Sequence, residues 1–543
     1  MLEIEGRTIG AVFDAAAARW PGRDFLVAAA WEGAPLRCLS YGQVAELVGR
    51  YERALRAAGY GIGHRIAVCL GTCPEHYILK LAANRAGLSF VPVNPDYRQG
   101  ELAYLLTDSG AALAVAGEAH AELMQAAIAE AGTGVGCVPF AAMLDALPPA
   151  PWPAEAGEVT PQTEAGLLYT SGTTGRPKGC ILSHEYELMV GDSYRLIGGA
   201  VALRDGGDRV FNPLPAFHIN AGIVAFFGVM LTGNCLIQPQ RFSARTWWKD
   251  IGESRATVFH YLGVVIAVLL ADRNAGPEVL GHLRVGVGAG VEPALHVEFE
   301  RRFGIPLIEV WGMTEMCRVM SMWQEPRRID TRAFGRARDD LEVQVWDDAG
   351  NPCPPGVPGE MVLRHSAETP GKGFFSGYLN KPEATQEAWA GGWFHTGDTV
   401  TMDAEGVLYF VDRKKNIIRR AGENIAAAEV ENILLEDERV VNVACVAVPD
   451  ETREEEVLAA VVLAEGVEPD AQTGMKIFQQ AFDRMAYYKL PGWIVFVESL
   501  PVTGTQKVVK HRIFDGDEDP RKRPGALDLR HLKTRHMGSA RSG

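Results

Sequence analysis

The chain has 543 residues, which is too long for one ordinary hydrophobic core and predicts two or more domains. Hydrophobic residues make up 47% and charged residues 22%, a composition that excludes a disordered chain. The formal net charge of −15 argues against broad nucleic-acid binding and identifies no substrate.

The first residues and the longest uncharged stretch argue against export and against a membrane span. The chain begins Met1-Leu-Glu-Ile-Glu5, so the acidic residues Glu3 and Glu5 stand where a signal peptide has a basic region followed by an apolar run. Polar residues and Pro239 interrupt the uncharged stretch 219–240, so we expect a core helix followed by a strand. Nine scattered cysteines without a His/Cys cluster are typical of reduced thiols. We therefore expect a cytoplasmic protein.

Residues from about 10 to 160 alternate between helical and strand patterns. Helices are predicted over 41–59 and 74–86, and buried strands over 65–70, 89–93 and 111–115. Such alternation favours an α/β fold with a mainly parallel sheet and helices on both faces.

The segment 169–179, Tyr-Thr-Ser-Gly-Thr-Thr-Gly-Arg-Pro-Lys-Gly, follows a short buried strand. Seven of its eleven residues are Gly, Ser or Thr, which let the backbone bend around an anion and offer N–H and O–H donors. A Walker A loop is excluded because Gly175 is followed by Arg-Pro and Lys178 by Gly. The segment predicts a triphosphate-binding loop, with an ordinary surface loop as the alternative. Its candidate ligands are Thr170, Ser171, Gly172, Thr173, Thr174 and Lys178.

Three further strand ends carry candidate site residues. A strand from Asp208 runs into a Pro-rich turn that presents His218, although a histidine at a strand end is usually structural. The strand 283–291 ends in Gly288-Ala289-Gly290, and it lacks the full dinucleotide-binding fingerprint. The strand 307–315 ends in Trp311-Gly312-Met-Thr314-Glu315. There Thr314 can donate to a phosphate and Glu315 can bind Mg²⁺, against the alternative of a solvated face.

The pattern changes after Arg336 to short strands separated by Gly, Pro and Asp turns, which indicates an antiparallel β subdomain. It leads to Trp393-Phe-His-Thr-Gly-Asp398 and a last strand that ends at Asp412. We expect an N-terminal domain over 1–412 and a small mobile α+β domain over 413–515. A loosely ordered tail over 516–543 is predicted because this stretch is polar, basic and contains Pro and Gly.

The ordered motif Y-T-S-G-T-T-G-x-P-K-G resembles the phosphate loop of the AMP-forming adenylate synthetases. This superfamily includes acyl-CoA ligases, peptide-synthetase adenylation domains and firefly luciferase. The resemblance covers residues from about 40 to 512 and includes at least six motifs in the right order. The segment from Asp412 to Glu431 looks most like acyl-CoA ligases of the crotonobetaine/carnitine-CoA ligase type.

The resemblance implies a role for each matching residue. His218 should lie at the mouth of the acyl pocket, and Gly288-Ala289-Gly290 with Trp311 and Gly312 should contact adenine or the acyl group. Asp398 and Arg413 should contact the ribose, and Lys507 should hold the substrate carboxylate. Lys415 takes the hinge position, and Gly422 and Glu423 belong to the face used in the second half-reaction. Trp311 replaces the usual tyrosine, and Gln506 replaces the usual glycine beside Lys507.

The implied reaction uses ATP, Mg²⁺ and coenzyme A. A carboxylate attacks the α-phosphate to give an acyl-adenylate and pyrophosphate, and a thiol then displaces AMP after the small domain swings about Lys415. The acyl pocket is expected near 218–224, 261–264, 286–290 and 310–316, with apolar side chains and no fixed cation for a second carboxylate.

Two alternatives stay open. The acceptor could be an amine or a carrier-protein thiol, or the chain could be a non-catalytic nucleotide-binding relative. The expected partners are a small carboxylic acid and CoA, with neither a nucleic acid nor a membrane span. The sequence carries no signal of oligomeric state, and a homodimer is compatible with it.

Overall fold

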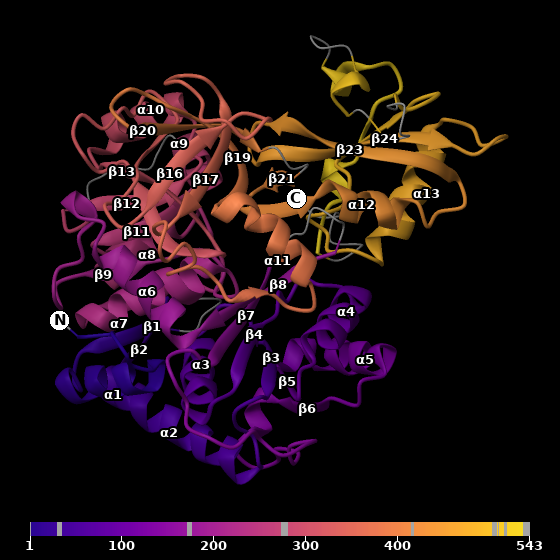
Figure 1. Cartoon of the computed structure of the whole chain (residues 1–543). Coiled ribbons are helices and arrows are strands. Elements are labelled where there is room, and N and C mark those ends of the chain that lie inside the picture. The colour runs from indigo at the N-terminus through magenta and orange to yellow at the C-terminus, as the bar shows by residue number, and fades with distance from the viewer. Residues whose placement is uncertain are drawn as a thin grey trace. The chain divides into compact units, whose positions relative to one another are not determined.

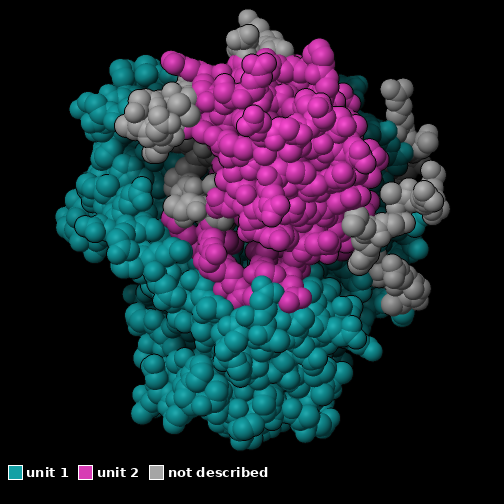
Figure 2. Space-filling view, turned by 90° about the vertical axis from the view of Figure 1, so that its right-hand side faces the viewer, with its two compact units in different colours: residues 1–95, 105–169, 179–414 teal, residues 96–104, 170–178, 415–543 magenta. Residues whose placement is uncertain are grey.

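The computed structural model describes residues 2–29, 35–170, 176–272, 281–413, 417–501, 508, 510–514 and 519–535, without the side chains of 412, 413, 428 and 511. The chain forms two compact units, which Figure 2 shows in different colours. Unit 1 comprises residues 1–95, 105–169 and 179–414, and unit 2 comprises residues 96–104, 170–178 and 415–543.

The first large sheet of unit 1 has eight strands in the order β14-β13-β12-β11-β9-β10-β1-β2 (Figure 1). The run from β13 to β1 is parallel, and β14 and β2 pair antiparallel at the two edges. Parallel strands have their carboxyl ends at the same edge of a sheet, and ligands usually bind at that edge. The candidate site residues that follow β9, β12 and β13 therefore lie along one edge of this sheet. The strands are β1 (Asp24–Ala28), β2 (Arg37–Ser40), β9 (Arg209–Phe211), β10 (Cys235–Gln238), β11 (Val258–Leu262), β12 (Val285–Ala289), β13 (Leu307–Met313) and β14 (Met316–Ser321).

The second large sheet has seven strands in the order β18-β8-β7-β4-β3-β5-β6. Strands β7, β4, β3, β5 and β6 are parallel, and β18 pairs antiparallel with β8. The strands are β3 (Arg65–Cys69), β4 (Ser89–Pro92), β5 (Leu113–Ala116), β6 (Gly136–Pro139), β7 (Glu164–Thr170), β8 (Lys178–Ser183) and β18 (Gly377–Tyr378).

Helices α1, α2, α3, α6 and α7 contribute to one buried core together with strands of both large sheets. Helix α3 illustrates how the sequence sets its bounds: Pro74 lies in the first turn, and Gly87 ends the helix with φ 94°, a conformation that favours glycine. The helices of the larger part of the chain are α1 (Ile9–Arg19), α2 (Tyr41–Ala57), α3 (Pro74–Ala86), α4 (Gln99–Ser109), α5 (Ala121–Ala131), α6 (His184–Arg195), α7 (Phe226–Thr232), α8 (Trp247–Ser254), α9 (Gly263–Ala271), α10 (Pro293–Phe303) and α11 (Pro382–Ala388), with short turns η1 (Glu118–His120), η2 (Phe140–Ala142), η3 (Gly199–Val201), η4 (Asn220–Ala225) and η6 (Ala390–Gly392).

The uncharged stretch 219–240 is confirmed as core helix followed by strand. It forms the π-helical segment η4, then α7, then β10, and α7 and β10 are buried throughout. None of the helices in the described ranges is long and apolar enough to cross a membrane.

A third sheet of unit 1 is the predicted antiparallel β subdomain. Its order is β15-β20-β19-β17-β16, and every pairing in it is antiparallel. The strands are β15 (Ala333–Arg336), β16 (Glu342–Trp346), β17 (Gly359–Arg364), β19 (Phe394–Met402) and β20 (Val407–Arg413).

Unit 2 contains a six-stranded sheet in the order β22-β21-β24-β25-β26, with β23 on β24, and a separate hydrophobic core. Its elements are β21 (Ile417–Arg420), β22 (Glu423–Ala426), α12 (Ala427–Leu434), β23 (Val440–Asp450), β24 (Glu454–Leu463), α13 (Ala471–Phe482), β25 (Trp493–Phe496), η7 (Lys510–Arg512), η8 (Pro520–Lys522), β26 (Leu527–Asp528) and η9 (Arg530–Leu532). The α/β fold with a β subdomain and a small α+β part is confirmed.

Residues 519–535 differ from the predicted loosely ordered tail. Strand β26 pairs with β25, and Leu529 is buried in the core of unit 2. The buried Lys533 ammonium forms an ion pair with Glu456, which also binds Arg420. A polar, basic stretch is therefore held in place, because its few apolar residues and one lysine find partners in unit 2.

Candidate active site

The predicted phosphate loop connects two strands. Thr170 is the last residue of β7, and Lys178 is the first residue of β8. A Walker A lysine instead stands at the start of a helix, so this geometry agrees with the exclusion of that motif. The loop residues Ser171, Gly172, Thr173 and Thr174 lie outside the described residues.

The Gly288-Ala289-Gly290 segment lies at the carboxyl end of β12, beside β11. A Cβ atom on Gly288 would lie 2.2 Å from the carbonyl oxygen of Tyr261, so only glycine fits there. Gly290 has φ 77°, which favours glycine, and its N–H donates to Oε2 of Glu309 at 2.9 Å. The packing of two neighbouring strands is therefore a sufficient structural reason for both glycines.

Glu309, on β13, is a buried carboxyl group that the sequence did not single out. Tyr261 Oη donates to its Oε1 at 2.7 Å. Burial raises the pKa of Glu309 to about 7, although these hydrogen bonds favour the ionised form. A titratable group near neutral pH thus lies between the strand ends that carry the candidate site residues. A lone Glu within a strand pattern gives no signal of such a role.

Glu315 and Thr314 are fixed by two tyrosines. Tyr378 Oη donates to Oε1 of Glu315 at 2.7 Å, and Tyr186 Oη donates to the carbonyl oxygen of Thr314 at 2.7 Å. Burial raises the pKa of Tyr378 far above its usual value, so the phenol stays a donor. No sequence pattern singles out either tyrosine, because Tyr378 and Tyr186 lie 63 and 128 residues from their partners along the chain.

The surroundings of Glu315 fit a Mg²⁺ ion. The carboxylate is a hard oxygen donor, its side chain direction is fixed, and Mg²⁺ usually keeps several waters and takes only one or two protein carboxylates. Within the described residues no group of three or more His, Cys, Asp or Glu could hold a metal. A fully protein-coordinated metal centre is therefore not formed by this part of the chain.

Trp311 and Asp398 contact each other. The indole Nε1 donates to Oδ2 of Asp398 at 2.9 Å, and both side chains are buried. Arg413 lies directly opposite Asp398 in the β19–β20 ladder, so the two predicted ribose contacts are neighbours in backbone register. The structure thus brings together three residues that the sequence placed in separate motifs.

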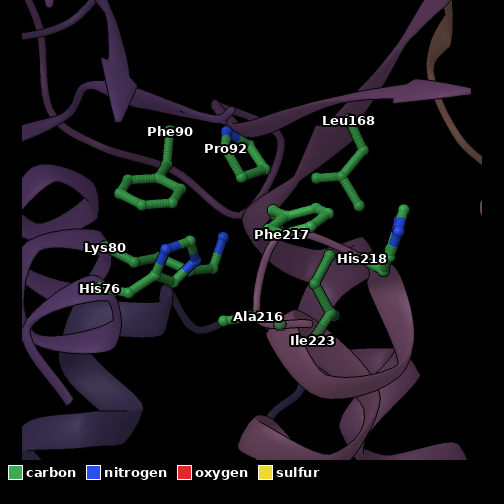
Figure 3. A pocket seen from close by; sticks show the side chains of 10 residues that line it. His76, Lys80, Phe90, Pro92, Leu168, Ala216, Phe217, His218 and Ile223 are labelled. Carbon is green, nitrogen blue, oxygen red and sulfur yellow. The ribbon is translucent and has the colours of Figure 1, made fainter. Parts of the chain in front are cut away.

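His218 lines a small pocket of unit 1 (Figure 3). His218, Gly222 and Ile223 come from the predicted acyl-pocket segments. The pocket also takes residues that the sequence did not suggest, from α3, β4 and β7, and one of them is Lys80. This cavity contains a lysine, but Lys80 is already paired with Glu187 and so is not a free cation for a second carboxylate. The lining residues are His76, Lys80, Phe90, Pro92, Leu168, Ala216, Phe217, His218, Gly222 and Ile223.

The candidate residues of unit 2 lie on the β21–β22 hairpin. Ala421 and Gly422 form its turn with φ 50° and 88°, and Glu423 pairs with Arg420 in the ladder. Lys415, Gln506 and Lys507 lie outside the described residues.

Comparisons with known proteins agree with this arrangement. A family model described as AMP-binding enzyme matches residues 13–379, and one described as AMP-binding enzyme C-terminal domain matches residues 429–507. The chain is similar to a sulfoacetate–CoA ligase of Cupriavidus necator, with 30% identity over 94% of this chain and 97% of the relative. It is also similar to a crotonobetaine/carnitine–CoA ligase of Proteus mirabilis, with 29% identity over 88% of this chain and 93% of that one.

A solved structure extends the likeness to the whole fold. The amide bond synthetase McbA of Marinactinospora thermotolerans superposes with a TM-score of 0.78 at 25% identity, covering 93% of this chain and 99% of that chain. Since one family model alone matches more than half of the residues, the chain belongs to the AMP-binding enzymes and is an AMP-forming ligase of the acid–thiol type.

Proposed function

We propose that this ligase activates a small polar carboxylic acid with Mg·ATP and transfers the acyl group to coenzyme A. The observation that carries the proposal is the fixed Glu315 carboxylate beside Thr314, at the carboxyl end of β13. Sulfoacetate and crotonobetaine or carnitine are the acids in the names of two relatives. Both are small polar acids, and the pocket that His218 lines also contains the polar side chains of His76 and Lys80.

In the first half-reaction, the substrate carboxylate attacks the α-phosphate and pyrophosphate leaves. No protein nucleophile is needed, so the chain contributes positioning and charge stabilisation. The loop from Thr170 to Lys178 would bind the phosphates. Glu315 would hold Mg²⁺, which neutralises phosphate charge when bound. Lys507 would hold the attacking carboxylate.

The adenosine would lie along the strand ends of unit 1. Trp311 offers an aromatic face to adenine, with Gly312 next to it, and the Gly288-Ala289-Gly290 backbone leaves room for close approach. Asp398 would accept from ribose hydroxyl groups, with Arg413 as its neighbour. His218 would border the acyl group.

In the second half-reaction, the thiol of CoA would attack the acyl carbonyl and AMP would leave. We assign residues 1–412 to the adenylating domain and 413–515 to a mobile domain, with a hinge at Lys415. The hinge motion would remove Lys507 and bring Gly422 and Glu423 to the site. One site would thus serve both half-reactions.

An amine acceptor is the second candidate, because the McbA structure is an amide bond synthetase with the same fold over 93% of this chain. It shares the first half-reaction and differs only in the group that displaces AMP. The nine cysteines are present as thiols, which favours a reducing compartment, and we propose the cytoplasm.

Pyrophosphate release should be measured with Mg·ATP across short, branched, aromatic, sulfonated and betaine-type acids, with and without CoA. Acid-dependent release with a thioester on addition of CoA is the expected result. Acid-dependent release with an amide from added amines, and no thioester, would select the second candidate. ATP binding without release from any acid would reject both and favour a non-catalytic relative, while Gln506→Gly tests whether that substitution disables Lys507.

A further inference from the structure

The wall of the pocket opposite His218 carries two buried polar side chains on one face of α3. Figure 3 shows His76 and Lys80 together on the side away from His218 and Leu168. The two residues are four apart on the helix, so their side chains are neighbours. Each is only 2% exposed. An otherwise apolar cavity therefore contains a concentrated polar end.

Lys80 is paired with a buried carboxylate. Its Nζ donates to Oε1 of Glu187, from α6, at 2.9 Å. The pair fits beside β7 only because residue 166 is glycine, since a Cβ atom there would lie 2.4 Å from Oε1 of Glu187. Removing either partner would leave an uncompensated buried charge. The ion pair as a whole carries no net charge.

The ammonium of Lys80 keeps donors for another acceptor. An ammonium has three N–H groups, and among the described residues Glu187 is its hydrogen-bond acceptor. The rings of Phe90 and Phe227 lie 5.3 and 5.8 Å from Nζ and offer only weak cation–π contacts. Since both Lys80 and Phe90 line the pocket, a donor is available at its polar end.

His76 contributes an acceptor. Burial and the charge of Lys80 lower the pKa of His76 to about 3, so the imidazole is neutral. Its ring hydrogen-bonds to the backbone of Ala216, and Nδ1 has no partner among the described residues. Nδ1 is therefore the ring nitrogen left for a ligand, and with the proton on Nε2 facing Ala216 it would present a lone pair.

A hydroxyl group satisfies both positions at once, because its O–H donates to Nδ1 of His76 and its oxygen accepts from Nζ of Lys80. A methyl group would leave Nδ1 of His76 without a partner in a buried site and would offer no acceptor to the remaining N–H groups of Lys80. A second carboxylate would add a negative charge beside a pair that is already neutral, and it has no hydrogen for Nδ1.

We propose that the carboxylic acid activated by this ligase carries a hydroxyl group at its far end, which binds between His76 and Lys80. This inference names the substrate class of the proposed function and rests on it. His76 and Lys80 are then specificity-determining residues. The preference should be large, because a site built for a hydroxyl group discriminates strongly against analogues that lack it.

The test uses the full chain and straight-chain acids of three to eight carbons that end in a hydroxyl group. Each acid is paired with the acid in which a methyl group replaces the hydroxyl and with the matching dicarboxylate. The readout is kcat/KM for pyrophosphate release. We expect the best hydroxy acid to exceed its methyl and dicarboxylate partners by about 10-fold or more.

Two variants of His76 distinguish the loss of its hydrogen-bond acceptor from a change in side-chain packing. His76→Asn can place an amide oxygen near the position of Nδ1, whereas His76→Gln can keep the bond to Ala216 but has no acceptor at Nδ1. The hydroxyl-over-methyl ratio should survive in His76→Asn and fall towards one in His76→Gln. The double variant Lys80→Met/Glu187→Met removes donor and counter-charge together and should also lower the ratio.

Some outcomes overturn the inference while leaving the ligase in place. These are release with the methyl acids as efficient as with the hydroxy acids, or an equal ratio in wild type and His76→Gln. The first would mean that a water molecule satisfies the two polar atoms. Release from none of the paired acids, together with release from unrelated acids, would also reject it. No release from any acid at all would instead count against the proposed function.

Discussion

The indole Nε1 of Trp311 donates a hydrogen bond of 2.9 Å to Oδ2 of Asp398, and this bond joins the proposed adenine and ribose contacts. Asp398 is 4% exposed and Trp311 is 6% exposed, so the bond is shielded from water. A phenylalanine at this position could still stack on a base, but it would leave a buried carboxylate without this donor.

Trp311→Phe should therefore raise the KM for ATP by about 5- to 30-fold, since a hydrogen bond to a charged group contributes about 1.5–3 kcal/mol, part of which other donors to Asp398 can recover. The ATP dependence of pyrophosphate release measures this effect. Trp346→Phe is the matched control, because it loses an indole bond to Gln344 in the β subdomain, away from the proposed nucleotide contacts. Equal KM values for the two variants would contradict the proposed role of the Trp311–Asp398 pair.

Because Tyr378 donates a hydrogen bond to Glu315, we expect that removing its hydroxyl group raises the Mg²⁺ concentration that the enzyme needs. Tyr378→Phe removes the group that orients the carboxylate, and such outer partners of a metal ligand typically matter by about 10- to 100-fold in affinity. The Mg²⁺ concentration for half-maximal pyrophosphate release should rise by about 10-fold. Tyr409→Phe, which loses a bond to Asp403 instead, should leave it unchanged. An unaltered Mg²⁺ requirement in Tyr378→Phe would rule out Glu315 as an oriented ligand.

We expect the thermal stability of the protein to depend on pH through the protonation of Glu309. Its pKa in the folded chain is about 7, above the ordinary value of 4.5, so the folded state holds the proton more tightly than the unfolded state. The stability that this proton contributes is present below pH 4.5 and is lost as the pH rises through about 7. Glu309→Gln imitates the protonated form, so the gap in Tm between variant and wild type should move in favour of the variant from pH 5 to pH 8.

Glu300→Gln is the control for that experiment. The pKa of Glu300 is lowered to about 2, with burial opposing the hydrogen bonds from His296 and Arg327 that lower it. Its stabilising contribution is therefore complete above pH 4.5 and is lost only as the pH falls towards 2. This variant should lower Tm by a similar amount at pH 5 and pH 8. A Glu309→Gln gap that does not vary with pH would mean that Glu309 stays ionised.

The segment 519–535 predicts that the end of the chain stabilises unit 2. Removing residues 519–543 deletes β26, the buried Leu529 and the Lys533 ion pair with Glu456. Hydrogen exchange of the backbone amides of β24 and β25 should show that unit 2 opens more readily in the truncated chain. Removing only 536–543 should have little effect. Lys533→Met should reproduce part of the loss, because it leaves Glu456 with Arg420 alone.

The proposed hinge predicts a split between the two half-reactions. Lys415→Pro fixes φ at the hinge, so adenylation should persist while thioester formation falls sharply. Lys415→Ala keeps the backbone free and serves as the control. Stopped assays should measure acyl-AMP and thioester separately, and an equal loss of both products in Lys415→Pro would argue against domain alternation.

The sequence by itself determined the α/β fold, the β subdomain and the order of the motifs. Helix and strand periods follow from which residues must be buried, and Pro74 and Gly87 mark the ends of α3 through their own backbone preferences. Motif order likewise singled out Glu315 and Asp398 as candidates, and the apolar run before residue 170 predicted the strand that enters the loop, without any knowledge of packing. The strand after the loop, β8, was not predicted.

Only the tertiary structure decided which side chains from distant segments meet. Along the chain, 63 residues separate Tyr378 from Glu315, and 87 residues separate Trp311 from Asp398. Lys80 and Glu187 are 107 residues apart. The Trp311–Asp398 and Lys80–Glu187 pairs are buried and the Tyr378–Glu315 pair is partly buried, so each hydrogen bond depends on the fold that brings two elements together. Local patterns record burial and backbone preference, whereas polar contacts across a core depend on three-dimensional packing, which no local pattern carries.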